Sequence, residues 1–203
     1  MPTPSATARP LRADAQRDYD AIIRAAAEEV ARTGAAASLE EIARVAGVGS
    51  ATLHRHFPSR WALLQAIFKD QVRAFCTRAQ TLADELEPGP ALRTWLLELI
   101  AYSATTGGLV DAFDIHLAPE HPLTPNTCEA MLVSAGQHLL HAAIADKVVR
   151  PDITVEELLA LVSAISLTTP DDPTPAKTAT RLLTIALNGV EPAQDPSQAA
   201  KRT

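Results

Sequence analysis

Residues 38–68 read SLEEIARVAGVGSATLHRHFPSRWALLQAIF, and they carry the clearest structural signals in the chain. Ser38 can cap the free N–H groups of a first helix, and Glu41 stands three residues later, as in a capping box. Gly47 stands where a left-handed residue would end that helix. The apolar residues between them recur at helical spacing: Leu39, Ile42, Ala43 and Ala46. The pattern predicts a short amphipathic helix followed by a tight turn.

A second helix of only about two turns follows. Ser50 can cap it, and Pro58 stops it. At about 100° per residue, Leu53 and Phe57 fall on one side, and the opposite side carries Ala51, Thr52, His54 and Arg55. One face therefore anchors the helix while the other is free to bind. Two short helices around such a turn predict a DNA-binding helix-turn-helix whose second helix enters the major groove.

Residues 38–68, and more loosely 19–80, resemble the N-terminal domain of the TetR family of bacterial transcriptional regulators. The matching residues are Ile42-Ala43, Ala46-Gly47-Val48, Gly49-Ser50, Thr52-Leu53-His54-Arg55-His56-Phe57 and Pro58-Ser59-Arg60. Two positions depart from the family pattern. His54 replaces the usual Tyr and can carry charge when protonated, and Arg60 replaces the usual Lys and keeps its charge.

The resemblance implies a set of DNA contacts. Phosphate contacts are expected from Ser38, Thr52, His54, His56 and Arg60, and base-edge contacts from Ser50, Ala51 and Arg55. Phosphate contacts set the register, whereas base edges carry specificity. Two alternatives stay open: His56 serves only a structural role beside Phe57, or the whole stretch is three packed helices with solvated polar faces.

Composition favours an all-α fold. Hydrophobic residues make up 47% of the 203 residues and aromatic residues only 4%, so the core must consist mainly of Ala, Leu, Val and Ile. No segment shows the alternation of a hairpin sheet, and no apolar run reaches the roughly 20 residues that span a bilayer. We therefore expect a cytoplasmic protein with no membrane partner and no signal peptide. Cys76 and Cys128 lack metal-ligand spacing, and no cofactor or metal is expected.

The net charge of −6 by itself argues against a nucleic-acid binder, but the charge is unevenly distributed along the chain. Residues 1–80 contain 11 Lys or Arg and 8 Asp or Glu, a net charge of +3. The remaining residues contain 7 basic and 16 acidic side chains, a net charge of −9. Because local potential decides where phosphates bind, an acidic body would turn the basic N-terminal part toward DNA.

The predicted organisation has five parts. They are a disordered arm at 1–16, a three-helix helix-turn-helix domain at 17–58, a linking helix at 59–87, a helical effector-binding and dimerisation domain at 88–190 and a disordered tail at 191–203. Arg9 and Arg12 of the arm either make no contact with DNA or reach a neighbouring minor groove. Helices are expected at 18–33 and, in the body, at 91–105, 109–117, 125–145, 154–167 and 174–188.

Residues 147–161 and 181–189 also resemble the last two helices of the family. Their apolar surface exceeds what the body of one chain can readily bury, so a homodimer interface is expected at Leu158, Leu161, Val162, Ile165, Leu182, Ile185 and Ala186. The family's helical cup implies a small-molecule effector site, with candidates Trp95, Leu99, Tyr102, Phe113, His116, Cys128, Met131 and His138. His138 and His141 lack further ligands at helical spacing, so they predict no metal site.

These features together predict a repressor. It would bind a pseudo-palindromic operator on double-stranded DNA as a dimer and leave it when a small-molecule effector binds. Two other classes remain as alternatives, a helical metabolite-binding enzyme and a helix-turn-helix adapter that binds protein. We expect no enzymatic activity, because the sequence contains no nucleophile elbow, phosphate loop or metal-ligand cluster.

Overall fold

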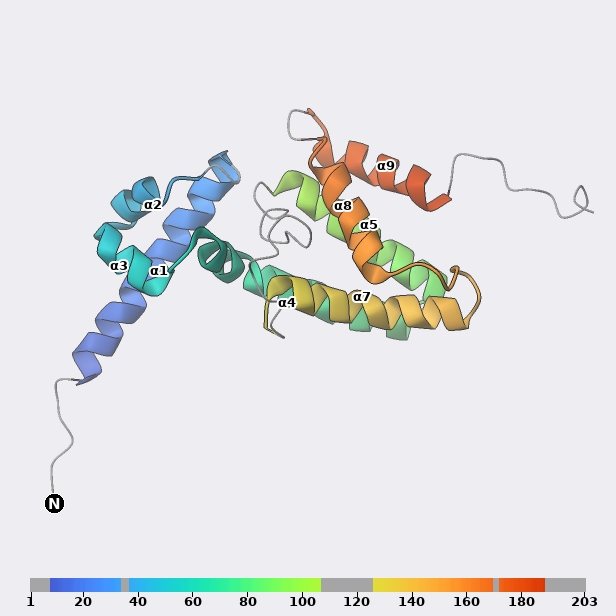
Figure 1. The fold of residues 1–203 in the computed structure, drawn as a ribbon, viewed down its shortest axis with the longest axis horizontal. Coiled ribbons are helices and arrows are strands. Elements are labelled where there is room, and N and C mark those ends of the chain that lie inside the picture. The colour runs from blue at the N-terminus through green and yellow to red at the C-terminus, as the bar shows by residue number, and fades with distance from the viewer. Residues whose placement is uncertain (1–7, 34–36, 107–125, 170–171, 189–203) are drawn as a thin grey trace, which may run out of the picture.

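A computed structural model describes residues 8–33, 37–106, 126–169 and 172–188, and within these ranges every regular element is a helix (Figure 1). The helices are α1 (Ala8–Thr33), α2 (Leu39–Ala46), α3 (Ser50–His56), α4 (Arg60–Glu85), α5 (Pro88–Thr105), α7 (Cys128–Ala145), α8 (Val155–Ser166) and α9 (Pro175–Asn188). The all-α prediction is confirmed. The helix expected at 109–117 lies outside the described residues, as do the tail at 191–203 and residues 1–7 of the expected arm.

Side-chain caps explain why several helices begin where they do. The Ser59 hydroxyl accepts a hydrogen bond from the Ala62 N–H (3.1 Å) at the start of α4. Thr154 forms a complete capping box with Glu157, because each residue's N–H donates to the other's side chain, at 2.8 and 3.2 Å. Such caps satisfy N–H groups that have no partner inside the helix. These starts lie within one residue of the predicted ones because the caps are local in sequence.

The first helix is longer than predicted. It begins at Ala8 rather than at Asp18, so the expected disorder of residues 1–16 is wrong for residues 8–16. These residues are mainly Ala, Leu, Arg and Gln, which favour helix, and Pro10 lies in the first turn, where its missing N–H costs little. Gln16 also donates to Asp20 one turn later, at 2.9 Å. Helix propensity therefore outweighs the effect of the single proline in residues 8–16.

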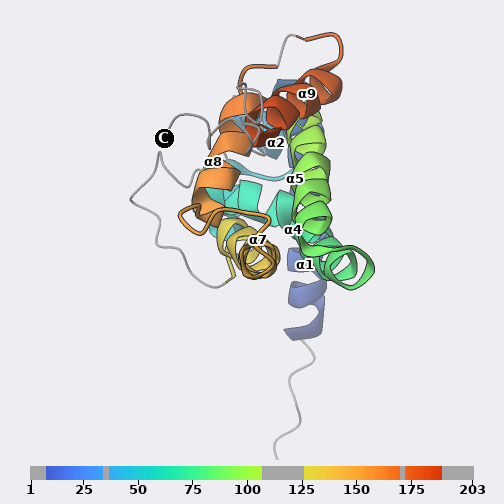
Figure 2. The same ribbon diagram turned by 90° about the vertical axis from the view of Figure 1, so that its right-hand side faces the viewer.

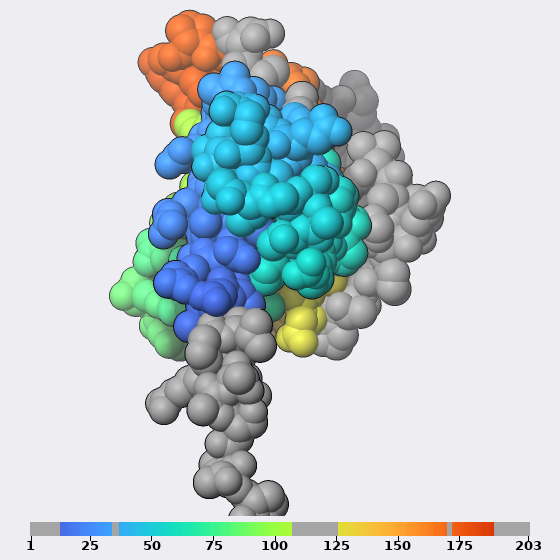
Figure 3. Space-filling model, turned by 90° about the vertical axis from the view of Figure 1, so that its left-hand side faces the viewer, coloured from blue at the N-terminus to red at the C-terminus, as the bar shows by residue number. Residues whose placement is uncertain are grey.

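The first three helices form a unit at one end of the molecule. Helix α1 packs against α2 and α4, and α2 packs against α3. Ile22, Ala26, Ile42, Leu53 and Phe57 are buried between them. Figure 3 shows α2 and α3 side by side on the outer face of this end, with α1 beside them. The predicted burial of Ile42, Leu53 and Phe57 is confirmed, and the packing places α3 at the surface.

The body is built around α5, which packs against α4, α7, α8 and α9 (Figure 2). Trp95 of α5 is completely buried, and its Nε1–H donates a hydrogen bond to the Phe75 carbonyl oxygen of α4 at 3.1 Å. Helix α4 continues from the N-terminal unit into this body (Figure 1). No helix in the described ranges has the length and hydropathy that a bilayer-spanning segment requires.

Gly136 allows α7 to approach α5 and α8 closely. A Cβ atom at this position would lie 2.5 Å from Val155 Cγ2 and 3.0 Å from the Trp95 ring. We expect Gly136→Leu to lower the free energy of unfolding by about 2 kcal/mol or more, because overpacking in a dense core outweighs the gain in helix propensity. Urea denaturation followed by circular dichroism measures the effect. Gln137→Leu, which adds the same side chain at the exposed neighbouring position, is the control, and equal midpoints would refute the packing argument.

Candidate functional site

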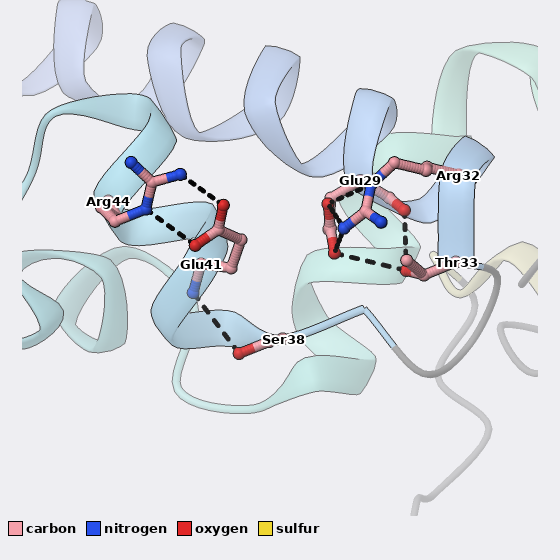
Figure 4. A network of polar contacts seen from close by, with 6 residues as sticks. All are labelled: Glu29, Arg32, Thr33, Ser38, Glu41 and Arg44. Atoms are coloured by element: carbon pink, nitrogen blue, oxygen red, sulfur yellow. Dashed lines mark hydrogen bonds and ion pairs between the residues drawn. The ribbon is translucent and has the colours of Figure 1, made fainter.

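Helix α2 presents its N-terminus at the surface. Ser38 is its N-cap, and the Ser38 hydroxyl accepts a hydrogen bond from the Glu41 N–H at 3.4 Å (Figure 4). The predicted return bond from Glu41 is wrong, because the Glu41 carboxylate binds the Arg44 guanidinium instead, with Nε to Oε2 at 2.8 Å. The hydrogen bond from Arg44 lowers the pKa of the Glu41 carboxyl. A two-pronged, charge-assisted bond thus replaces half of the expected capping box.

The turn between the two helices depends on Gly47. Its φ of 71° lies in the left-handed region, and its N–H donates to the Arg44 carbonyl oxygen at 3.2 Å. This conformation is readily available to glycine. Gly49 is the N-cap of α3, so the predicted capping role of Ser50 is wrong; Ser50 is the first helical residue. Its side chain remains exposed at the helix N-terminus.

Helix α3 has one anchored and one open face. Leu53 and Phe57 are only 1% and 3% exposed and hold the helix in place. The side chains predicted to contact DNA on this helix lie elsewhere on its surface: Ser50, Ala51, His54 and Arg55 are exposed, and Thr52 is half-buried. The structure therefore brings these five residues together on one short helix at the outer face of the molecule (Figure 3).

His56 and Arg60 are less accessible than the other predicted DNA contacts. The His56 ring lies edge-on to Tyr19 of α1, with 6.2 Å between the ring centroids. Arg60 is half-buried, and its buried Nη2 atom has no hydrogen-bond partner within the described part of the chain. Either side chain must turn outward before it can reach a phosphate. The structural role that the sequence left open for His56 is thus consistent with its packing.

The candidate effector residues that the structure describes are divided between the core and the surface of the body. Trp95 and Leu99 lie in the packed core of the body. Cys128 is buried against Gln65 of α4, whose Oε1 accepts a 2.7 Å hydrogen bond from the Cys128 N–H. Burial raises the pKa of the Cys128 thiol to about 12, so the group stays protonated at neutral pH.

The remaining candidates are divided between a groove, the body and the undescribed region. Met131 and His138 of α7 line a groove of about 420 Å³, together with Cys76, Ala79 and Gln80 of α4. Tyr102 is half-buried, and its ring lies edge-on to Phe75 with 5.5 Å between centroids. Phe113 and His116 lie outside the described residues. Sequence periodicity could not reveal the groove, because its walls belong to helices far apart in the chain.

A larger groove was also missed by sequence reasoning. It measures about 780 Å³ and lies where the start of α5, the segment 148–153, α8 and the end of α9 meet. Most of its lining is apolar, including Leu92, Leu96, Leu161 and Leu187. Two basic residues, Arg93 and Arg150, complete the lining. Both grooves fall within the roughly 300–1,000 Å³ typical of small-molecule sites.

Glu129 is the most unusual polar side chain that the sequence analysis did not identify. It lies in the first turn of α7 and is only 2% exposed. Gln65 Nε2 donates a 3.1 Å hydrogen bond to its Oε1 atom. Burial raises the pKa of this carboxyl, although hydrogen bonds from Thr127, Trp61 and Gln65 oppose the rise. An acidic residue in a first turn usually complements the helix dipole at the surface, so the sequence carried no signal of its burial.

The predicted dimer residues separate into two groups. Leu158 and Val162 are buried by the chain's own body. The others remain at least partly accessible on α8 and α9: Leu161, Ile165, Leu182, Ile185 and Ala186. Leu167, at the end of α8, is an exposed apolar residue that the sequence analysis missed. A substantial apolar surface therefore remains on the last two helices.

Two family models match the chain. Residues 22–67 match a model described as bacterial regulatory proteins, tetR family. Residues 87–192 match the C-terminal domain of SbtR-like transcriptional regulators. No curated protein gave a significant match.

Solved structures extend the likeness over most of the chain. A TetR transcriptional regulator from Streptomyces coelicolor is 36% identical, with 86% of this chain and 98% of that chain covered and a TM-score of 0.53. FadR from Thermus thermophilus, solved with lauroyl-CoA, shares the fold at 22% identity, covering 87% and 97% of the two chains with a TM-score of 0.59. FadR from Bacillus subtilis, solved with stearoyl-CoA, does so at 17% identity, covering 85% and 100% with a TM-score of 0.60. The open face of α3, the two family models and the 36% identical relative together make this chain a member of the TetR family of bacterial transcriptional regulators.

Proposed function

We propose that the protein is a repressor that binds a pseudo-palindromic operator as a homodimer and leaves it when a small-molecule effector binds. The observation that carries the proposal is the surface of α3. Leu53 and Phe57 anchor this helix, while Ser50, Ala51 and Arg55 are exposed along it. Small residues at a helix N-terminus permit close approach to the major groove, and an arginine can form a two-pronged bond with guanine.

Phosphate binding is supported by the surroundings of α3. Ser38 is exposed at the N-terminus of α2, where N–H groups and the helix dipole favour an anion. Residues 1–80 carry a net charge of +3, against −9 for the rest of the chain. The chain would therefore approach DNA with its N-terminal end, in the cytoplasm where the operator lies.

Dimerisation supplies the second recognition helix that a two-fold symmetric operator requires. The accessible apolar side chains of α8 and α9 support an interface there, because two copies of the same face can cover each other in a symmetric dimer. Leu182 and Ile185 lie one turn apart on α9, and each residue is 36% exposed. We therefore place the interface on these two helices.

Release by an effector is supported by the relatives and by the grooves. The two FadR structures contain acyl-CoA ligands, and this chain shares their fold. Its described residues form grooves large enough for a small molecule, among them those of about 420 and 780 Å³. An effector that prefers the released form by about 1–3 kcal/mol would weaken DNA binding roughly 5- to 150-fold.

Arg55→Ala tests the DNA-binding surface. An operator is first selected by the wild-type protein from a pool of randomised double-stranded DNA. Fluorescence anisotropy should then show that Arg55→Ala binds this operator about 10-fold or more weakly than the wild type does. The variant should also discriminate less well at one base pair, because a base-edge contact is lost. Arg150→Ala, an exposed arginine at the far end of the body, should leave binding unchanged. Equal losses in the two variants would rule out a specific contact by Arg55.

The two alternative functions, a protein-binding adapter and a metabolite-binding enzyme, can be tested with the same purified protein. Phosphate neutralisation makes log affinity fall steeply with log salt, by about 0.9 per phosphate contact. A steep slope supports DNA binding, whereas selective capture of a protein with a flat salt response favours the adapter. Turnover of a bound metabolite by the purified protein would instead support the enzyme.

A further inference from the structure

Glu129 is a buried carboxylate with an unused acceptor. Its Oε1 atom accepts the 3.1 Å hydrogen bond from Gln65 Nε2. Its Oε2 atom is also buried and accepts no hydrogen bond from the described residues. Buried carboxylate oxygens are normally satisfied, and one that is not marks a place where a donor is missing.

The missing donor is best supplied by a cation. The side chains that hydrogen-bond to Glu129 are Thr127, Trp61 and Gln65, and all three are neutral. No ion pair in the described ranges includes Glu129. A carboxyl group buried to this degree either is paired with an opposite charge or takes up a proton. Because neutral donors do not compensate the charge, burial raises the pKa of the Glu129 carboxyl, and a bound cation would hold the group in its charged form.

The same carboxylate ties α7 to the helix that leads to the DNA-binding unit. Trp61 and Gln65 lie in the first two turns of α4, which begins at Arg60 directly after α3. Gln65 bridges the two helices, because its Nε2 donates to Glu129 while its Oε1 accepts the 2.7 Å bond from the Cys128 N–H. Any ligand that draws Glu129 away from α4 therefore acts on the position of the DNA-binding unit.

We propose that Glu129 is the polar anchor for an organic cation, an ammonium or amidinium whose N–H groups donate to Oε2, and that the bound cation weakens the hold of Glu129 on Gln65 and Trp61. The proposal rests on the ligand-responsive regulator proposed above and names the chemical class of its effector. Charge-assisted N–H···O bonds are roughly twice as strong as neutral ones. The net charge of −9 after residue 80 would also attract a cation to the body.

The test uses the full-length protein and pairs of probes that differ in charge. Isothermal titration calorimetry compares benzamidinium with benzamide and benzylammonium with benzyl alcohol. We expect at least one cation to bind about 10-fold or more tightly than its neutral partner, because only the cation compensates the buried charge. In Glu129→Gln the cation should lose about 10-fold or more in affinity, while the neutral probe should be unaffected.

Glu98→Gln is the matched control. Glu98 is a half-buried carboxylate of α5 that already has a counter-charge, with its Oε1 2.8 Å from Arg78 Nη2. This variant should bind the cations as the wild type does. Circular dichroism melts confirm that both variants are folded. Equal binding of cation and neutral probe, unchanged cation binding in Glu129→Gln, or no cation binding below about 10 mM would each overturn the proposal.

A DNA-binding measurement separates this proposal from the proposed function. The cation that binds the wild type should lower its affinity for the selected operator, and Glu129→Gln should lose this response. Gln65→Met, which removes the amide that links the carboxylate to α4, should keep cation binding and show a smaller DNA response. If the protein binds cations through Glu129 but no DNA, the regulator function fails and the cation site stands. If it binds DNA without any response to the bound cation, the link through α4 is refuted.

Discussion

Replacing Trp95 with alanine is expected to lower the free energy of unfolding by about 3–5 kcal/mol. Trp95 is completely buried at the centre of the body, where its ring lies against the position of Gly136. The substitution leaves a large cavity, and it removes the 3.1 Å hydrogen bond from Nε1 to the Phe75 carbonyl oxygen. Urea denaturation followed by circular dichroism measures the loss.

Trp95→Phe separates the two contributions. It keeps most of the aromatic volume and removes the indole donor, so it should cost clearly less than Trp95→Ala, about 1–3 kcal/mol. A denaturation midpoint for Trp95→Ala close to that of the wild type would show that α5 is not the centre of the core. The same result would reopen Trp95 as a wall of the effector site.

The double variant Leu182→Glu/Ile185→Glu is expected to be a monomer with operator affinity reduced by about 10²-fold or more, because a single recognition helix loses the gain from bivalent binding. Both side chains are exposed on α9, so the acidic groups should not disturb the core of one chain. In the proposed interface, by contrast, they would place like charges against each other without solvent. Light scattering measures the mass, and fluorescence anisotropy measures the affinity.

Leu86→Glu/Val148→Glu provides the control for this experiment. Both residues are exposed and apolar, at 40% and 56%, and neither lies on α8 or α9. This variant carries the same added charge, so it should keep the dimeric mass and most of the operator affinity. A dimeric mass for the α9 variant would exclude the proposed interface and require another arrangement of the two recognition helices.

Local signals in the sequence located the helix-turn-helix correctly. Ile42, Leu53 and Phe57 are buried as the helical spacing predicts. Gly47 has the left-handed conformation that its place after Ala46 suggested. These features depend on backbone geometry and on residues no more than about four positions apart. A single chain segment contains all the information that decides them.

Competition among nearby polar groups was harder to predict. The Glu41 carboxylate had two possible partners, the Ser38 N–H and the Arg44 guanidinium, and it binds the guanidinium. Ser50 was a plausible cap, but the extended backbone of Gly49 already occupies the capping position. The sequence shows which partners are within reach, whereas side-chain geometry selects among them.

Local sequence patterns are enough to specify the helical class, the helix-turn-helix and the residues of its open face. The burial of Trp95 and Leu158 and the exposure of Leu182 depend on how the helices pack, because periodicity identifies an apolar face but not what covers it. The same holds for Glu129, an acidic residue that is buried where α7 packs against α4. Local spacing specifies the helices, whereas the long-range contacts between the helices determine which side chains are buried from solvent.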